Sequence, residues 1–178
     1  MNTSRASNTS NSPNSPNTTN ASNAPSVASA ANAPSSHLDP HDKSGPFNRI
    51  EHIGIAVQNL DEAVSRYEQT MGCPCYKREV VESEGVETAF FRAGESKIEL
   101  LAAVRSDSPI ARFLEKRGEG MHHVAFGVDD IRREMERCRS LGYTLLNETP
   151  KPGADNKLVA FLHPKEHNGV LIELCQDR

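Results

Sequence analysis

A short segment that occurs twice constrains this chain more than any other feature. The first copy is residues 52–57, His-Ile-Gly-Ile-Ala-Val, and the second is residues 123–128, His-Val-Ala-Phe-Gly-Val. In both copies a histidine opens a predicted strand, bulky apolar residues alternate with small ones, and an amphipathic helix follows. A repeat of this kind predicts a duplicated module whose two halves share one core.

Alternation along each repeated strand places the histidine on a face whose other residues are small. His52 shares its face with Gly54 and Ala56, and alanine and glycine lie in the same way beside His123. Side chains two residues apart on a strand point to the same side of a sheet. This face has room for something other than protein, so we expect it to line a cavity.

Capping residues mark the helix that follows each repeated strand. We expect Asn59 to cap the first helix and Gly72 to end it. In the second copy, either Asp129 or Asp130 is the expected cap, and Gly142 ends the helix. The predicted strands that complete the two copies are 76–81, 86–92 and 97–102, and then 143–147, 157–162 and 170–175.

Each copy is therefore a βαβββ module, and the modules span about 48–105 and 119–178. Between them, Ser108 and Pro109 have the residue types expected at the N-cap and first position of a connecting helix. One such module is too small to be stable alone. The predicted fold class is α+β, with two βαβββ modules forming a curved open-barrel sheet that has its helices outside and its histidine face inside.

The last strand of each module carries a glutamate between apolar neighbours. Glu99 lies in Lys-Ile-Glu-Leu-Leu and Glu173 lies in Leu-Ile-Glu-Leu-Cys. A buried carboxylate without a partner is costly, so an ion is its natural neighbour. Together with His52 and His123, these residues predict a site for a divalent metal ion, and the donor types suit Co, Mn, Zn, Ni or Fe(II).

The remaining histidines are weaker candidates for metal ligands. His122 directly precedes His123, so on a regular strand it faces the other way, and we expect it at the rim of the site or behind the ligands. The others lie in a predicted turn or in the N-terminal tail: His163, His167, His37 and His41.

The N-terminal residues differ in composition from the rest of the chain. Residues 1–45 are mostly Asn, Ser, Thr, Pro and Ala, with Arg5 as the only charged residue before His37. Such a tract has little to bury, so we expect a disordered tail, followed by one domain at 46–178. The tail has neither the apolar run of a secretory signal nor the repeated arginines of a mitochondrial presequence, and no stretch is apolar enough to span a bilayer.

Charge and cysteine content restrict the partners and the compartment. The net charge of −4 and the scattered basic residues argue against a nucleic-acid partner, and a membrane partner is not expected either. No Cys-x-x-Cys motif is present, so we expect free thiols and a reducing compartment. Because the tail carries a single arginine, we expect a cytoplasmic location rather than the mitochondrial matrix. The four cysteines are Cys73, Cys75, Cys138 and Cys175.

Several segments besides the metal motif resemble one family. Residues 47–176 are similar to the vicinal oxygen chelate superfamily and, within it, to the methylmalonyl-CoA epimerases. The segments that carry this resemblance beyond the repeat are Ser-Pro-Ile-Ala-Arg-Phe-Leu from Ser108, Gly-Met-His-His-Val-Ala-Phe from Gly120, Lys-Pro-Gly-Ala from Lys151, Val-Ala-Phe-Leu-His-Pro from Val159 and Gly-Val-Leu-Ile-Glu-Leu from Gly169.

The resemblance implies a reaction, namely inversion at C2 of methylmalonyl-CoA between its R and S forms in propionyl-CoA metabolism. A metal contact with the substrate oxygens would stabilise the enolate, and two bases would serve its two faces. The family pattern implies Glu173 as one base and an acid before the second strand as the other. The position that matches this acid in the family pattern is occupied by Ser83. A neighbouring acid must therefore act as the second base, and we favour Glu84 over Glu82.

Other functions share this metal pattern. Glu99 stands where some epimerases have glutamine and glyoxalase I has glutamate, so a glyoxalase I-type isomerase of a glutathione hemithioacetal is one alternative. A 2-His-1-carboxylate dioxygenase and a non-catalytic ligand-binding protein are two others. The substrate-binding residues stay unassigned, and the basic candidates for the CoA phosphates are Lys151, Lys157 and Arg112. The family is often dimeric, which makes a homodimer an expectation by resemblance.

Overall fold

The computed structural model of the chain describes residues 45–178. The tail predicted to be disordered, 1–45, lies outside the described residues except for Gly45. Over 45–178, no helix has the length and apolar character needed to cross a membrane.

Eight strands form one mixed sheet, and three α-helices accompany it. The order of strands across the sheet is β2-β3-β4-β1-β5-β8-β7-β6. The strands are β1 (Arg49–Ala56), β2 (Lys77–Val81), β3 (Val86–Ala93), β4 (Ser96–Ala103), β5 (Gly120–Gly127), β6 (Lys151–Pro152), β7 (Lys157–Leu162) and β8 (Leu171–Asp177). The helices are α1 (Leu60–Met71), α2 (Pro109–Arg117) and α3 (Ile131–Ser140), with a short 3₁₀ helix at Pro164–Glu166.

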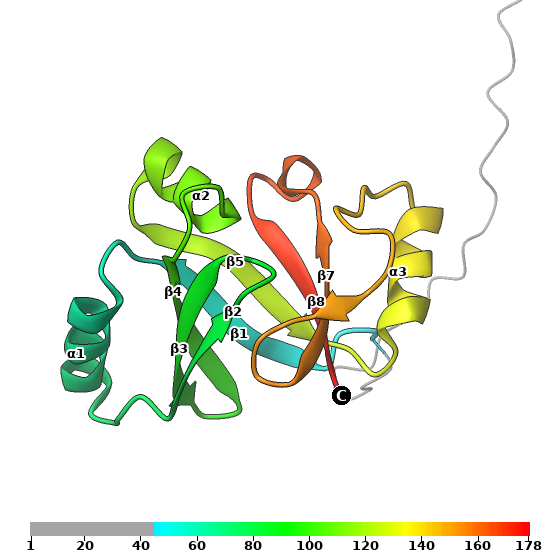
Figure 1. The fold of residues 1–178 in the computed structure, drawn as a ribbon. Coiled ribbons are helices and arrows are strands. Elements are labelled where there is room, and N and C mark those ends of the chain that lie inside the picture. Colours follow the sequence, from blue (N-terminus) through cyan, green and yellow to red (C-terminus); the bar gives the residue numbers. More distant parts are fainter. Residues whose placement is uncertain (1–44) are drawn as a thin grey trace, which may run out of the picture. The chain divides into compact units, whose positions relative to one another are not determined.

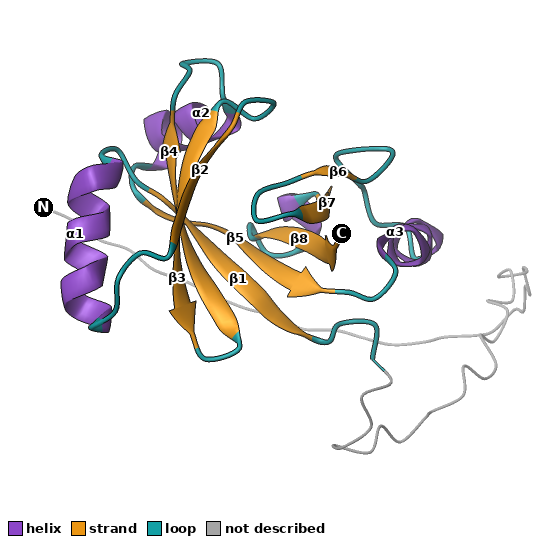
Figure 2. Ribbon diagram, turned by 60° about the horizontal axis from the view of Figure 1, so that its bottom comes forward, coloured by secondary structure: helices purple, strands orange, loops and turns teal. Residues whose placement is uncertain are grey.

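The two repeated strands lie side by side at the centre of the sheet. β1 pairs with β5 in antiparallel fashion, and Gly54 lies opposite His123. Each of these strands pairs on its other side, in parallel, with the last strand of its own module, β4 or β8. Figure 2 shows β1 and β5 running beside each other, with β8 next to β5. The predicted pair of βαβββ modules in one curved sheet is confirmed, with α2 as the connection.

The helices α1 and α3 pack on the outer face of the sheet and lie at opposite ends of it in Figure 1. Leu60 and Ala63 of α1 pack against Phe91 of β3, which is fully buried. Ile131 of α3 packs against Leu174 of β8. Burial of one such large apolar side chain stabilises a fold by about 1.5–3 kcal/mol. The outer positions of the strands thus form two core clusters under α1 and α3. The inner positions line a site and also form two smaller clusters, one of which includes Ile110 of α2.

Side-chain caps begin both outer helices as the sequence predicts. The Asn59 side chain accepts from the amides of Asp61 and Glu62 at the start of α1. At α3 the cap is Asp130, whose carboxylate accepts from two backbone amides of the first turn. Asp129 instead accepts a bond from the Asn48 side chain at 2.7 Å. The alternative between the two aspartates is thereby decided in favour of Asp130.

The predicted strand at 143–147 is wrong. Only an isolated bridge joins Leu145 to Leu162 of β7. The backbone amide and hydroxyl of Thr144 bond at 2.8 and 2.7 Å to the carboxylate of Glu166, which follows β7 in the 3₁₀ helix. The amide of Thr144 is therefore not available for a strand ladder, and the segment runs as a loop beside β7.

Candidate metal centre

A cavity of about 470 Å³ opens on the inner face of the sheet. Alternate residues of the strands line it, so β4 contributes Lys97 and Glu99, and β8 contributes Glu173 and Cys175. The period of two along each strand sends these side chains inward and their neighbours outward into the core. The cavity lies where the sequence places the face of the repeated histidines.

The four predicted ligands meet in this cavity. The Nε2 atoms of His52 and His123 lie 2.9 Å apart. Glu99 Oε2 is 3.3 Å from Nε2 of His52 and 3.4 Å from Nε2 of His123. The corresponding distances from Glu173 Oε2 are 3.6 and 3.1 Å. All four residues are buried. The four residues thus converge on one point, although His52 on the first strand and Glu173 on the last are 121 positions apart in the sequence.

The geometry of this group fits one metal ion. Nitrogen and oxygen ligands bind a divalent transition metal at about 2.1 Å, so neighbouring ligands of one ion lie about 3.0–3.5 Å apart. The contacts between the imidazoles and the carboxylates fall close to that range. Ligand atoms of His52, His123 and Glu173 lie within 4.8 Å of one another, and Glu99 joins them through both imidazoles. This is the donor set of a divalent cation site.

The small residue beside His123 has a more specific role than leaving a cavity open. A Cβ atom added at Gly54 would lie 2.1 Å from Cε1 of His123 and 2.5 Å from both ring nitrogens. The imidazole therefore occupies the space that any other residue at position 54 would fill. Gly54 allows His123 to reach the position at which its Nε2 meets that of His52.

Opposite charges in the group shift the pKa values of its members. Burial opposes the ionisation of Glu99, but the two imidazoles outweigh burial and lower its pKa to about 2. Burial disfavours the charged form of His52, yet the carboxylates of Glu99, Glu173 and Glu51 outweigh it and raise the His52 pKa well above its ordinary value. The carboxylates thus create a field that attracts a cation.

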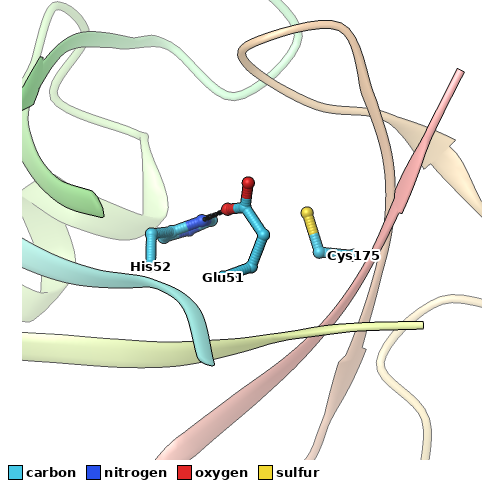
Figure 3. A group of neighbouring side chains, drawn as sticks. All are labelled: Glu51, His52 and Cys175. Carbon is cyan, nitrogen blue, oxygen red and sulfur yellow. Dashed lines mark hydrogen bonds and ion pairs between the residues drawn. The ribbon is translucent and has the colours of Figure 1, made fainter. Parts of the chain in front are cut away.

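Glu51 is a site residue that the sequence analysis missed. Its side chain is buried and accepts a hydrogen bond from Nδ1 of His52, as Figure 3 shows. Strict alternation predicts that Glu51 and His52 point to opposite faces. The pairing of β1 with β5 shifts by one residue between Ile50 and His52, so Glu51 is the extra residue of a β-bulge. A bulge redirects a side chain, and here it brings Glu51 to the face of His52.

A second group of metal-ligand types lies next to the first. Glu51, His52 and Cys175 offer ligand atoms within 4.8 Å of one another. Two ammonium groups already contact Oε1 of Glu51, one from Lys97 and one, at 3.1 Å, from Lys157. Although burial opposes ionisation of Glu51, His52 and Lys97 lower its pKa far below the ordinary value. The lysines supply the positive charge here, so this group is an ion-pair cluster behind the metal centre.

His122 does not face away from the site, which corrects the prediction from alternation. It lines the cavity, and its Nδ1 atom lies 2.9 Å from Nδ1 of His123. The β1–β5 pairing shifts again between Gly54 and Ile55, whose partners are His123 and Met121, so His122 is the extra residue of a second bulge. Burial and the neighbouring His123 lower the pKa of His122 to about 4.

The two acidic candidates for the second base lie in different surroundings. Glu84 lines the cavity, and its Oε1 atom is 2.6 Å from Nζ of Lys151. Glu82 is exposed outside the cavity lining, and its backbone carbonyl accepts a bond from Arg105 at 2.7 Å. Ser83, the strict match to the family pattern, is exposed as well. The geometry therefore favours Glu84 over Glu82 as a group that can reach a bound molecule.

The three basic residues suggested as ligands of the CoA phosphates also differ in their surroundings. Lys151, Arg112 and Lys157 all line the cavity. Lys157 is buried and is held by the carboxylates of Glu51 and Asp177. A lysine that already neutralises two carboxylates is a poor phosphate ligand, which leaves Lys151 and Arg112 as the candidates.

Comparison with known proteins places the chain in a family. A model of the Glyoxalase/Bleomycin resistance protein/Dioxygenase superfamily matches residues 51–161. The chain belongs to this superfamily. This membership agrees with the family resemblance inferred from the sequence, and so does the fold.

Several relatives of similar length are epimerases. The mitochondrial methylmalonyl-CoA epimerase of Bos taurus is 38% identical over 80% of this chain and 83% of the relative. The ethylmalonyl-CoA/methylmalonyl-CoA epimerase of Cereibacter sphaeroides is 40% identical over 72% of this chain and 97% of the relative. A solved variant of Streptomyces coelicolor methylmalonyl-CoA epimerase, in complex with 2-nitronate-propionyl-CoA, has a TM-score of 0.72 and 38% identity over 74% of this chain and 98% of that one.

Proposed function

We propose that the protein is a metal-dependent methylmalonyl-CoA epimerase that interconverts the R and S configurations at C2. The observation that carries this proposal is the convergence of His52, His123, Glu99 and Glu173 within one cavity. The relatives of the chain include epimerases of this substrate. A metabolic place in propionyl-CoA metabolism and a cytoplasmic location are part of the proposal.

The substrate explains why such a site is needed. The hydrogen at C2 lies between a thioester carbonyl and a carboxylate, so its removal leaves an enolate with negative charge on oxygen. A divalent ion held by the four ligands would stabilise that charge. The nitronate in the Streptomyces coelicolor complex is also planar at its reacting carbon and carries its charge on oxygen. Its presence in a relative supports the enolate route for this chain.

The residues of this chain supply the proton transfers. Epimerisation needs one group on each face of the planar intermediate, so that a proton leaves from one side and returns on the other. We assign Glu173 to one face and Glu84 to the other. Both carboxylates line the cavity, and they come from different modules. Nζ of Lys151 lies 2.6 Å from Oε1 of Glu84, so this ion pair would hold the carboxylate in position at the cavity.

Removal and return of metal tests the proposed function. Protein stripped with a chelator should lose epimerisation of (2S)-methylmalonyl-CoA, and addition of single divalent ions should restore it, because the ion would supply the positive charge that stabilises the enolate oxygens. Turnover would be measured by chiral separation of the CoA esters. Full activity without metal would contradict the proposal, and activity only with methylglyoxal and glutathione would indicate a glyoxalase instead.

The neighbouring acids Glu84 and Glu82 form a matched pair for testing the second base. Glu84→Gln should lower kcat by roughly 100-fold or more, because general acid–base groups contribute about 10²–10⁴ to rate. Glu82→Gln, an equal change at an exposed position two residues away, should leave kcat within about twofold. Steady-state kinetics in both directions of epimerisation would measure the effect. Small and equal changes in the two variants would place the second base elsewhere.

A further inference from the structure

Each metal-binding histidine is preceded in the chain by a residue that bonds to the back of its ring. Glu51 Oε2 accepts from Nδ1 of His52, and Nδ1 of His122 lies 2.9 Å from Nδ1 of His123. Glu51 and His122 occupy the same position in the two modules, one residue before the histidine. The duplicated fold therefore repeats this arrangement with two different residue types.

Two β-bulges produce the arrangement. Glu51 falls between the paired residues Ile50 and His52 and has no partner of its own on β5, and His122 is the unpartnered residue on β5. Without these extra residues, the side chain before each histidine would turn to the outer face. Bulges at this position on both central strands indicate that the site requires these two side chains on the inner face.

The tautomer that a metal ion requires of each histidine explains why these two side chains are needed on the inner face. The Nε2 atoms of both histidines face the carboxylates and each other, so Nε2 must offer its lone pair to an ion. Nδ1 then carries the hydrogen and needs an acceptor, which fixes both the tautomer and the orientation of the ring. The carboxylate of Glu51 accepts at His52. The lone pair on Nδ1 of His122 accepts at His123.

Both acceptors are themselves held in place. Lys97 and Lys157 contact Oε1 of Glu51 and leave Oε2 for the histidine. His122 packs edge-to-face against Phe113 of α2, with 5.0 Å between the ring centroids. A side chain fixed by its own partners can fix the next one, and such outer contacts tune a metal ligand.

We propose that Glu51 and His122 are positioning residues that hold Nε2 of His52 and of His123 toward the metal ion. The inference rests on the metal centre of the proposed function, and it adds the two groups that orient its imidazoles.

Two replacements of His122 test the inference in the full-length protein with Co²⁺ as the probe. His122→Phe keeps a ring against Phe113 but removes the acceptor, and it should raise the Kd for Co²⁺ by about 10–100-fold. His122→Asn returns an acceptor oxygen near the place of Nδ1 and should recover most of the affinity. Glu51→Gln keeps the shape but loses the charge, and it should also weaken binding and alter the visible absorption spectrum of the bound Co²⁺.

Competition with a chelating dye would measure each Kd, and thermal unfolding of the metal-free variants would report on the fold. A folded His122→Phe variant with the wild-type Kd and spectrum would overturn the inference, and so would equal weakening by phenylalanine and asparagine. If His122→Phe does not fold, a wild-type Kd and spectrum for Glu51→Gln would overturn it. Wild-type protein that binds Co²⁺ but does not epimerise would refute the proposed function alone.

Discussion

Gly54→Ala is expected to remove nearly all activity from a protein that still folds. The new methyl group would lie 2.1 Å from Cε1 of His123, so the imidazole must leave its position. Displacement of a catalytic group by about 1 Å can cost about 100-fold in rate. We expect at least that loss in kcat and a comparable loss in metal affinity. Epimerisation kinetics and a competition titration with a chelator would measure the two effects.

Gly127→Ala is the matched control for this change. Gly127 lies on the other repeated strand, and a Cβ added there would be 3.4 Å from its nearest neighbour, the flexible side chain of Arg49. Overpacking should be small in this variant, so kcat and metal affinity should stay within about twofold of the wild type. Equal behaviour of the two alanine variants would mean that the close approach of Gly54 and His123 has no functional role.

The second large effect is expected for Glu173→Gln. The change keeps the size and one oxygen of a buried side chain, but it removes a group that we assign both to the metal and to proton transfer. Loss of a general base alone costs about 10²–10⁴ in rate, so kcat should fall by at least about 1,000-fold even at saturating metal. Glu148→Gln, at an exposed position of the same module, should have no effect.

Kinetics of Glu173→Gln at excess metal would separate the two proposed roles of Glu173, as a metal ligand and as a base. If high concentrations of the divalent ion restored the wild-type kcat to Glu173→Gln, the carboxylate would serve as a ligand only. The assignment of Glu173 as a base would then be wrong, although the metal centre would stand.

The repeated strand was sufficient to predict much of the fold and the four side chains that converge. Asn59 capped α1 as expected because capping depends on a local sequence pattern. His52 and Glu99 were predictable because a regular strand has a fixed period, and both lie on regular stretches. The proposed set of metal ligands follows from that period and from the duplication.

The two residues whose orientation strand alternation predicts wrongly lie where the period is interrupted. Glu51 and His122 are extra residues in two bulges, and no residue type in the sequence marks a bulge on a central strand. The space beside Gly54 was expected to be open, yet it is filled by a ring from the neighbouring strand. Such a contact depends on the register between β1 and β5, which strand periodicity does not determine.

Hydrogen exchange at C2 of methylmalonyl-CoA tests the central claim most directly. In deuterated water, the wild-type protein with its metal should incorporate deuterium at C2 as it epimerises the substrate. The C2 proton leaves to one carboxylate, and the other carboxylate returns a deuteron that it has taken from the solvent. Mass spectrometry of the CoA ester would detect the label, with an enzyme-free sample for the background. Incorporation no faster than that background would contradict proton removal at this site and, with it, the proposed epimerase.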